Sequence, residues 1–482
     1  MTDGLPQDHL ERVSAWGGAT SVMSWVYRPT DVAGIEAMFA TARTHGRSVG
    51  LRGAGQSYGD AALNAENVCL DLTRMARILA WDPTTGRIRV EPGVTIEQLW
   101  RYTIEDGWWP PVVPGTMAVS LGGGAAMNFH GKNNWKVGPI GDHVIELEVL
   151  LPTGERLCCS REIDADLFHA VIGGYGMLGC IVSLELQLTR VHSGLLDVEA
   201  IPAANLDEMT SIFEARLDDA DYLVGWIDCF ARDDRVGRGL VHAARYLESG
   251  ADPAPSQSLR PVNQELPETL FGVVPKSMLW LMMRPVVNDL GLRAVNAAKY
   301  HQSALAGVRH YRQSHVGYAF LLDYVPGWRR AYGPGGLIQY QSFIPAEAAR
   351  QAFPALLARA RTHGLVPYLG VFKRHRPDDF LMTHGVDGYS LAMDFKVTHR
   401  NRRRLWEAAR ELSRLVVDVG GRFYPAKDSV LTAELYAASL GAERLGRFRA
   451  LKERCDPEHL LQTDLSRRLL AAPTPAPHGA LD

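Results

Sequence analysis

Apolar positions in the first part of the chain alternate between the spacings typical of helices and of strands. Residues 31–46 predict an amphipathic helix, because their apolar side chains recur every three or four positions. These positions are Val32, Ile35, Met38 and Phe39. The next segment, residues 47–53 (RSVGLRG), predicts a short strand that ends on a glycine-rich stretch. A helix therefore leads into a strand that ends at glycines.

The same pattern continues with a strand, a hairpin and a second helix. Residues 68–73 (VCLDLT) predict a strand, residues 77–93 predict a β-hairpin that turns at 84–86, and residues 95–107 predict another amphipathic helix. Glycine-rich loops between strands end at about residue 192. Mixed strands and helices continue to about residue 418, interrupted by a proline-rich loop at 250–268. We therefore expect a second domain in this later part of the chain.

Composition narrows the class of protein. The 482 residues include 46% apolar residues, which is enough to form two or three globular domains. The formal net charge of −3 provides no basic field, so a nucleic acid is not expected as a partner. His310 and His315 have a spacing seen in metal sites, but no cysteine pair completes such a site. We interpret this pair as structural and expect no metal.

Cysteine usage and the chain start favour a reducing compartment. The six cysteines form no C-x-x-C pair, which argues against a disulfide framework; they are Cys69, Cys158, Cys159, Cys180, Cys229 and Cys455. The first 18 residues carry acidic side chains and no apolar core of a signal sequence, so a cytoplasmic protein is expected.

One segment, residues 270–292, raises the question of a membrane. It is apolar but is interrupted by Pro275, Lys276, Arg284 and Pro285. Its uncharged run is far shorter than the roughly 20 apolar residues that a membrane-spanning helix needs. We expect that it does not cross a bilayer, and that it either covers a pocket or lies on a membrane surface.

The glycine-rich stretch after the first strand reads GAGQSYGD, residues 53–60. Glycines at 53, 55 and 59 allow backbone N–H groups to converge on an anion without Cβ atoms in the way. A tight turn between strands is the alternative interpretation, since such short motifs are weak evidence.

A second glycine cluster, residues 114–144, makes the anion site more credible. Two glycine-rich loops about sixty residues apart, each next to a predicted strand, could enclose a pyrophosphate from both sides. Neither cluster matches the Rossmann fingerprint or the P-loop, so a different dinucleotide-binding fold is required.

Longer motifs then indicate a family. The chain contains RGAGQSYGD, PGT followed by VSLGGGAAMNFHGKN, DADLFHAVIGGYGMLGCIV, AYGPGGLIQYQSFIP, GGRFYPAKDS and DPEHLLQTDLSRRL, in this order. Together they resemble the FAD-linked oxidase family of the vanillyl-alcohol oxidase type, from about residue 20 to residue 470. The HGKN and YPAKDS elements are the most discriminating.

The resemblance implies an α+β fold in which a two-part FAD-binding domain of the vanillyl-alcohol oxidase type carries an inserted α+β substrate domain over the flavin. The expected boundaries are 1–192 and 419–470 for the two parts of the FAD-binding domain, 193–418 for the substrate domain, and 471–482 for a disordered tail.

The resemblance also implies which residues bind FAD. They are Gly53, Ala54, Gly55, Gln56, Ser57, Tyr58, Gly59, Gly115, Ser120, Leu121, Gly122, Gly123, Asn128, His130, Ile181 and Tyr424. Some relatives attach the flavin covalently through a histidine in the first loop, where this chain has Gln56, so non-covalent FAD is expected. For His130 the alternative is a structural histidine.

The substrate side is expected on the strand that contains QYQ. Side chains alternate along a strand, so Gln339 and Gln341 share one face, and paired amides suit a ligand rich in hydroxyl groups. A solvent-facing strand edge is the alternative. The resemblance places this strand across the flavin. Lys132 and Lys373 are expected to meet an anionic or polar part of the substrate, and Gln341 and Lys427 are expected to be catalytic; for the lysines the alternative is a solvated surface position.

Two substitutions separate the chain from the relatives that it most resembles. Those relatives have a tyrosine and a cysteine in the substrate pocket, where this chain has Ala319 and Ala392. Smaller side chains reshape the pocket, so the chemistry is expected to transfer more securely than the substrate.

The resemblance implies an FAD-dependent oxidoreductase that oxidises a secondary alcohol of a sugar or polyol. The alternatives are an aldonolactone or alditol oxidase, a flavin-dependent C=C reductase, and a flavin-binding partner subunit without turnover; the intact YPAKDS and QYQ elements argue against the last. The electron acceptor is left open between oxygen and a quinone or another acceptor. Further expectations are peripheral contact with the inner membrane and a partner reductase that completes an epimerisation.

Overall fold

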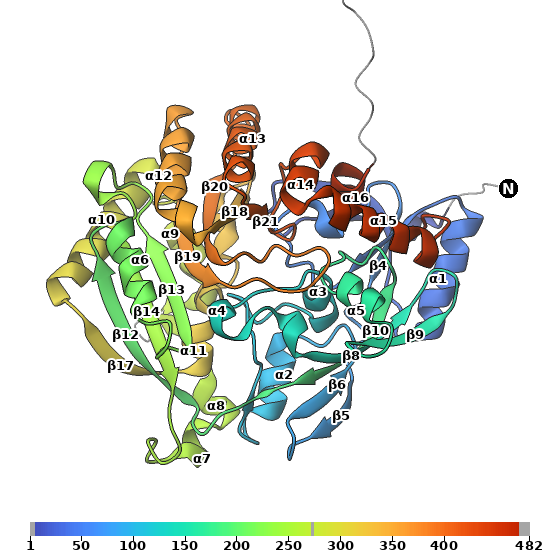
Figure 1. Cartoon of the computed structure of the whole chain (residues 1–482), viewed down its shortest axis with the longest axis horizontal. Helices are drawn as coiled ribbons and strands as arrows, with labels where there is room; N and C mark the ends of the chain where they lie inside the picture. The colour runs from blue at the N-terminus through green and yellow to red at the C-terminus, as the bar shows by residue number, and fades with distance from the viewer. Residues whose placement is uncertain (1–4, 271–273, 472–482) are drawn as a thin grey trace, which may run out of the picture.

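The computed structural model describes residues 5–270 and 274–471, which form an α+β structure (Figure 1). The α+β class expected from the sequence is confirmed. The expected disordered tail, residues 471–482, lies outside the described residues except for Ala471.

Strands in the first 190 residues form two main sheets among the described residues. The four-stranded sheet has the order β1-β2-β4-β3, and the five-stranded sheet has the order β5-β6-β10-β8-β9. The bounds are β1 Leu10–Ser14, β2 Ser21–Tyr27, β3 Val49–Arg52, β4 Val68–Asp71, β5 Ile78–Asp82, β6 Arg87–Val90, β8 Val144–Leu150, β9 Arg156–Ser160 and β10 Cys180–Gln187, with β7 Trp108–Trp109 paired to β11 Thr189–Arg190.

A larger antiparallel sheet follows, with the order β17-β12-β14-β13-β19-β20-β18-β21. Its strands are β12 Leu195–Ala203, β13 Tyr222–Ile227, β14 Gly239–Tyr246, β17 Arg309–Ser314, β18 Leu337–Pro345, β19 Leu369–His375, β20 Gly388–Lys396 and β21 Arg422–Phe423. The helices that lie along this part of the molecule in Figure 1 include α6 Leu206–Glu214, α10 Asp289–Ala306, α12 Ala346–Thr362 and α13 Arg402–Asp418.

The two helices predicted from apolar spacing are confirmed. Helix α1 (Val32–Thr44) begins after Asp31, whose carboxylate accepts a hydrogen bond from the Gly34 N–H, and it buries Ile35 and Phe39. Helix α2 (Ile96–Thr103) begins with a capping box between Thr95 and Gln98. The predicted hairpin is also present, with β5 and β6 paired antiparallel.

The second glycine cluster is not a loop throughout, which corrects the expectation from the sequence. Residues 121–126 (LGGGAA) form helix α3, Leu121–Ala126. Glycine disfavours helices, but here a Cβ would overlap Pro92 at Gly122 and Phe129 at Gly124, so only glycine allows this close packing. The remaining helices are α4 Asn134–Val137, α5 Ala165–Val171, α7 Pro255–Ser258, α8 Pro261–Gln264, α9 Leu279–Met283, α11 His315–Ala319, α14 Ala433–Leu440, α15 Ala442–Cys455 and α16 Asp464–Leu469.

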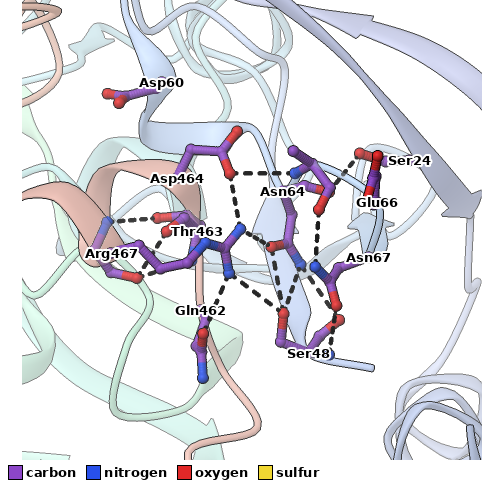
Figure 2. Close-up of polar contacts among 12 residues, drawn as sticks. Ser24, Ser48, Asp60, Asn64, Glu66, Asn67, Gln462, Thr463, Asp464 and Arg467 are labelled. Carbon is purple, nitrogen blue, oxygen red and sulfur yellow. Dashed lines mark hydrogen bonds and ion pairs between the residues drawn. The ribbon is translucent and has the colours of Figure 1, made fainter. Parts of the chain in front are cut away.

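The C-terminal helices return to the N-terminal sheet. Figure 2 shows Arg467 of α16 between Asn64 and Asp464, with nitrogen–oxygen distances of 2.6 and 2.7 Å. The Val49 N–H donates to the Leu460 carbonyl at 2.7 Å. Chain ends about 400 residues apart in sequence therefore form one folded unit.

Arg468 strengthens this junction. Its guanidinium donates to the Asp60 carboxylate, which follows the first glycine loop, and to Asp428, which follows the YPAK motif, both at 2.6 Å. One side chain thus holds together three segments around the glycine loop.

The apolar segment 270–292 is broken into short elements. Outside residues 271–273, which the structure does not describe, it contains β16 Val274–Pro275, α9 and the first turn of α10. None of the described helices has the length and apolar content to cross a membrane.

The two histidines with metal-like spacing differ in environment. His315 is 1% exposed, and its Nε2 lies 2.8 Å from the Ser193 carbonyl oxygen while Nδ1 has no partner. Burial lowers the pKa of His315 to about 4. His310, on β17, is exposed.

We expect His315 to make the folded state sensitive to acid. In the unfolded chain a histidine has a pKa of about 6.5, so this side chain is protonated below that pH. In the folded chain His315 stays neutral down to about pH 4. Stability should fall as the pH decreases from 7 to 4, by about 3 kcal/mol from this residue alone. The free energy of unfolding in urea should therefore be higher for the parent than for His315→Gln at pH 7, and this difference should become smaller as the pH falls. His310→Gln is the control, and a pH-independent gap for His315→Gln would contradict the assignment.

Candidate functional site

A large cavity, here called the main cavity, lies between the glycine-rich segments and the eight-stranded sheet. Its volume is about 530 Å³. It is lined by residues 51–58, by parts of 114–130, and by side chains of β13, β18, β19 and β20. Segments that are far apart in the sequence therefore meet around one cavity.

The two glycine clusters touch each other at this cavity. The Ala54 N–H donates to Ser120 Oγ at 3.0 Å, and a Cβ on Gly53 would overlap that same oxygen. Gly55 has φ +67°, a conformation that favours glycine. The backbone of the first loop thus lines the cavity without side chains in the way, as a cradle for a large anionic ligand requires.

Most of the predicted cofactor residues line the cavity, but three do not. Gly53 to Tyr58, Gly115, Ser120, Gly122, Gly123, His130, Ile181 and Tyr424 line it. Gly59 instead packs against the Asp428 carbonyl, Leu121 is in the hydrophobic core, and Asn128 accepts a hydrogen bond from the Gly141 N–H at 2.9 Å. These three residues support the cavity wall from behind.

The paired glutamines both line the cavity from β18. Gln339 donates to the Asp394 carboxylate of β20 at 2.6 Å. Gln341 donates to Ser390 Oγ at 3.2 Å and lies 3.1 Å from His130 Nε2. Each amide is therefore held in a fixed orientation at the cavity wall.

Asp394 was not identified from the sequence. It is fully buried, its second carboxylate oxygen has no partner in the described part of the chain, and burial raises its pKa to about 7. The available signal was its position two residues after Ala392, which puts both on one strand face. Asp394 anchors Gln339 and lies close enough to Lys427 to affect its titration.

Three predicted lysines line the cavity. Burial lowers the pKa of Lys427 to about 7, although the Asp394 carboxylate acts in the opposite direction, and burial lowers the pKa of Lys132 to about 7 and of Lys373 to about 8. The Lys427 ammonium lies 3.8 Å from the centre of the Tyr58 ring. The cavity is thus rich in amino groups that can be charged or neutral near neutral pH.

His130 is neutral in this environment. It is 5% exposed, and burial, with added repulsion from Lys373, holds its pKa well below the ordinary value. Since the Gln341 amide donates to Nε2, the ring proton is on Nδ1, which has no partner among the described residues. A buried donor without a partner at a cavity wall fits a ligand contact.

The two predicted pocket substitutions, Ala319 and Ala392, also line the cavity. Their small side chains leave room where a larger one would project. The lining offers glycine cradles, two fixed amides, an unpartnered imidazole N–H and three amines, and this donor set fits FAD together with a hydroxyl-rich molecule.

Comparison with known proteins agrees with this picture. A family model described as "FAD binding domain" matches residues 23–160. The chain is 30% identical over 467 residues to decaprenylphosphoryl-beta-D-ribose oxidase of Mycolicibacterium smegmatis, covering 95% of this chain and 97% of that protein.

Other relatives match mainly over part of their length. A putative D-arabinono-1,4-lactone oxidase of Neurospora crassa is 29% identical over 186 residues, or 38% of this chain and 33% of that protein. The mitochondrial L-galactono-1,4-lactone dehydrogenase of Arabidopsis thaliana is 27% identical over 208 residues, or 42% and 33%.

Proposed function

Because the chain belongs to the FAD-linked oxidase family of the vanillyl-alcohol oxidase type, it is an FAD-dependent oxidoreductase, and we propose that it oxidises a secondary alcohol of a sugar or polyol. The relative from Mycolicibacterium smegmatis is named for oxidation of a phosphoryl-linked ribose, and the similarity extends over nearly the whole chain. The proposed product is a ketone.

The fixed pair of amides on β18 carries this proposal. Gln339 and Gln341 face the cavity two positions apart, and each is anchored by a neighbour, Asp394 or Ser390. An amide offers both a donor and an acceptor, so two of them can orient neighbouring hydroxyl groups of a sugar. Orientation by fixed groups is a large part of what a protein contributes to such a reaction.

The reaction removes a hydride from the carbinol carbon and a proton from its hydroxyl group. Bound FAD supplies the acceptor for that hydride. Gln341 and Gln339 orient the hydroxyl groups, and the Lys427 ammonium stabilises developing negative charge at the cavity wall. The hydroxyl proton leaves to a base or to solvent.

The cofactor is proposed to be held without a covalent bond, by the predicted residues that line the cavity: residues 53–58, Gly115, Ser120, Gly122, Gly123, His130, Ile181 and Tyr424. Gln56 stands where covalent relatives have a histidine, and its side-chain amide donates to the Ala54 carbonyl at 3.1 Å. An amide cannot form the histidyl link to the flavin.

We therefore expect acid precipitation of the purified protein to release all the yellow colour into the supernatant. The absorbance of supernatant and pellet near 450 nm is the measurement, and unfolding in guanidinium followed by filtration provides a second one. Colour that stays with the unfolded chain would contradict non-covalent binding.

Anaerobic mixing of the FAD-loaded enzyme with candidate substrates tests the proposed function. Sugars and sugar phosphates should bleach the flavin spectrum, while aldonolactones and alditols should do so far more slowly. The lactone-oxidising alternative draws support from the Neurospora and Arabidopsis relatives. Bleaching by lactones alone would establish that alternative, and reoxidation of pre-reduced enzyme only by unsaturated compounds would establish a C=C reductase.

The finer expectations about partners also belong to this proposal. We propose a small-molecule electron acceptor, either oxygen or a quinone, a partner reductase that completes an epimerisation, and a cytoplasmic enzyme in peripheral contact with the inner membrane. Membrane contact is supported by exposed apolar side chains of α9 and α10, among them Leu281, Met282, Leu290 and Leu305.

A further inference from the structure

A second cavity opens from the first on the far side of Lys132. Its volume is about 370 Å³, and residues of α10, β14 and β17 line it. Lys132, Val224, His242, Lys299 and Leu321 line both cavities. The second cavity, here called the side chamber, is therefore continuous with the substrate end of the main cavity.

The side chamber is lined by basic groups and by no carboxylate among the described residues. Arg309 enters it from β17, Lys299 from α10 and His242 from β14, and Lys132 stands at the junction. Within residues 5–270 and 274–471, no carboxylate forms an ion pair with Lys132, Lys299 or Arg309. Burial, with added repulsion from Lys299, Lys132 and Arg309, lowers the pKa of His242 to about 4.

The fold aims these groups inward by simple strand geometry. On β17, Arg309, Tyr311 and Gln313 line the chamber at alternate positions, while His310 and Arg312 lie on the other face. The acidic neighbours are on that other face too, where Glu199 lies near His310. No carboxylate of the described residues therefore faces the basic groups inside the chamber.

The two lysines are held by groups that do not neutralise them. The Lys132 ammonium donates to the Tyr318 carbonyl and lies 4.4 Å from the centre of the Tyr318 ring, and it is 8% exposed. The Lys299 ammonium lies 4.0 Å from the centre of the Trp226 ring. Aromatic faces position a cation and leave it able to bind an anion.

We propose that the side chamber binds the phosphate of a sugar phosphate ester, whose sugar ring reaches the main cavity past Lys132. This inference rests on the proposed function and narrows it, because neutral polyols and lactones would leave the basic groups unpaired. Arginine and lysine are the side chains that phosphate groups prefer, and each charged contact contributes about tenfold to affinity.

The chamber is also open to solvent at the end of α10. Gln302, Ala306 and Arg309 are exposed there, beside the exposed apolar residues Leu305 and Val308. A phosphate could thus belong to a soluble monoester or to a diester whose second substituent extends outward. The shared chemistry is the phosphate ester, and the experiment separates the two sources.

Binding to the FAD-loaded enzyme without turnover is the test, measured by calorimetry under air-free conditions. The probes are inorganic phosphate, ribose, ribose 5-phosphate and a detergent-dispersed polyprenyl phosphate. Ribose 5-phosphate should bind the parent at least about tenfold more tightly than it binds Arg309→Gln, and about 100-fold more tightly than the double variant Lys299→Gln/Arg309→Gln. Ribose should bind all of them equally.

Arg312→Gln is the matched control, because it removes the same charge from the opposite face of the same strand. It should bind every probe as the parent does. If only the polyprenyl phosphate shows the dependence on Lys299 and Arg309, the source is a lipid-linked ester and the proposal stands. Equal binding of both phosphate probes to the parent and the double variant would overturn it.

The result also separates this inference from the proposed function. Charge-dependent phosphate binding without bleaching of the flavin by any sugar would leave the phosphate site in place and refute the oxidase proposal. Bleaching by neutral sugars, with rates unchanged in the double variant, would support the oxidase proposal and refute the phosphate site.

Discussion

The variant Lys427→Ala is expected to retain FAD and to be reduced by its substrate at least about 100-fold more slowly than the parent. The Lys427 ammonium lines the main cavity against the Tyr58 ring and close to Asp394. A fixed charge in a site with little water stabilises the negative charge that develops during hydride removal. Anaerobic stopped-flow measurement of flavin bleaching gives the rate.

Retention of FAD by this variant follows from the separate location of the glycine cradles. Lys427→Arg should restore only part of the rate, because a planar guanidinium is a poor copy of a compact ammonium. Lys136→Ala serves as the control, since Lys136 is half-exposed and pairs with Asp221 instead of lining the main cavity. Bleaching of Lys427→Ala at the parental rate would remove the lysine from the mechanism.

The variant Gly59→Ala, which adds one methyl group, is expected to weaken FAD binding strongly. A Cβ there would overlap the Asp428 carbonyl oxygen, at a place where the neighbouring Tyr58 N–H donates to the Ala426 carbonyl at 2.9 Å. Overpacking of this kind costs about 1–3 kcal/mol. Gly59→Ala should therefore separate the first glycine loop from the segment that carries Lys427, and weaken FAD binding about tenfold or more.

FAD content after gel filtration and the apparent Kd for added FAD measure this loss. Gly446→Ala is the matched control, because Gly446 of α15 has open space around it and alanine is a better helix former. Full retention of FAD by Gly59→Ala, with an unchanged melting temperature, would contradict the proposed packing.

Local rules were sufficient where the chain follows one periodicity. Helix α1 formed where Ile35 and Phe39 recur at helical spacing after the capping residue Asp31, and the hairpin β5–β6 formed around its predicted turn. Helix α3 escaped prediction because its three glycines have low helix propensity, and the packing of Gly122 and Gly124 against Pro92 and Phe129 decides the outcome.

Residues of the site could be predicted only where they belong to a sequence motif or follow from the alternation of side chains along a strand. Gln339 and Gln341 share a face because side chains alternate along β18. Asp394 anchors Gln339 because β18 and β20 pair, and Lys299 and Arg309 line the side chamber because α10 and β17 both border it. No local sequence pattern predicts such contacts between distant segments.

The bridge made by Arg468 has a consequence for how the protein is made. Asp60 and Asp428 are joined only when a side chain 408 positions beyond Asp60 has been synthesised and has left the ribosome. The first glycine loop therefore lacks this bridge until the segment that carries Arg468 has been synthesised, and cofactor loading is expected to follow that step. Ribosome-bound chains stalled before Arg468 should be unable to hold FAD, and they expose the unsealed sheet edge of β3 to chaperones and proteases.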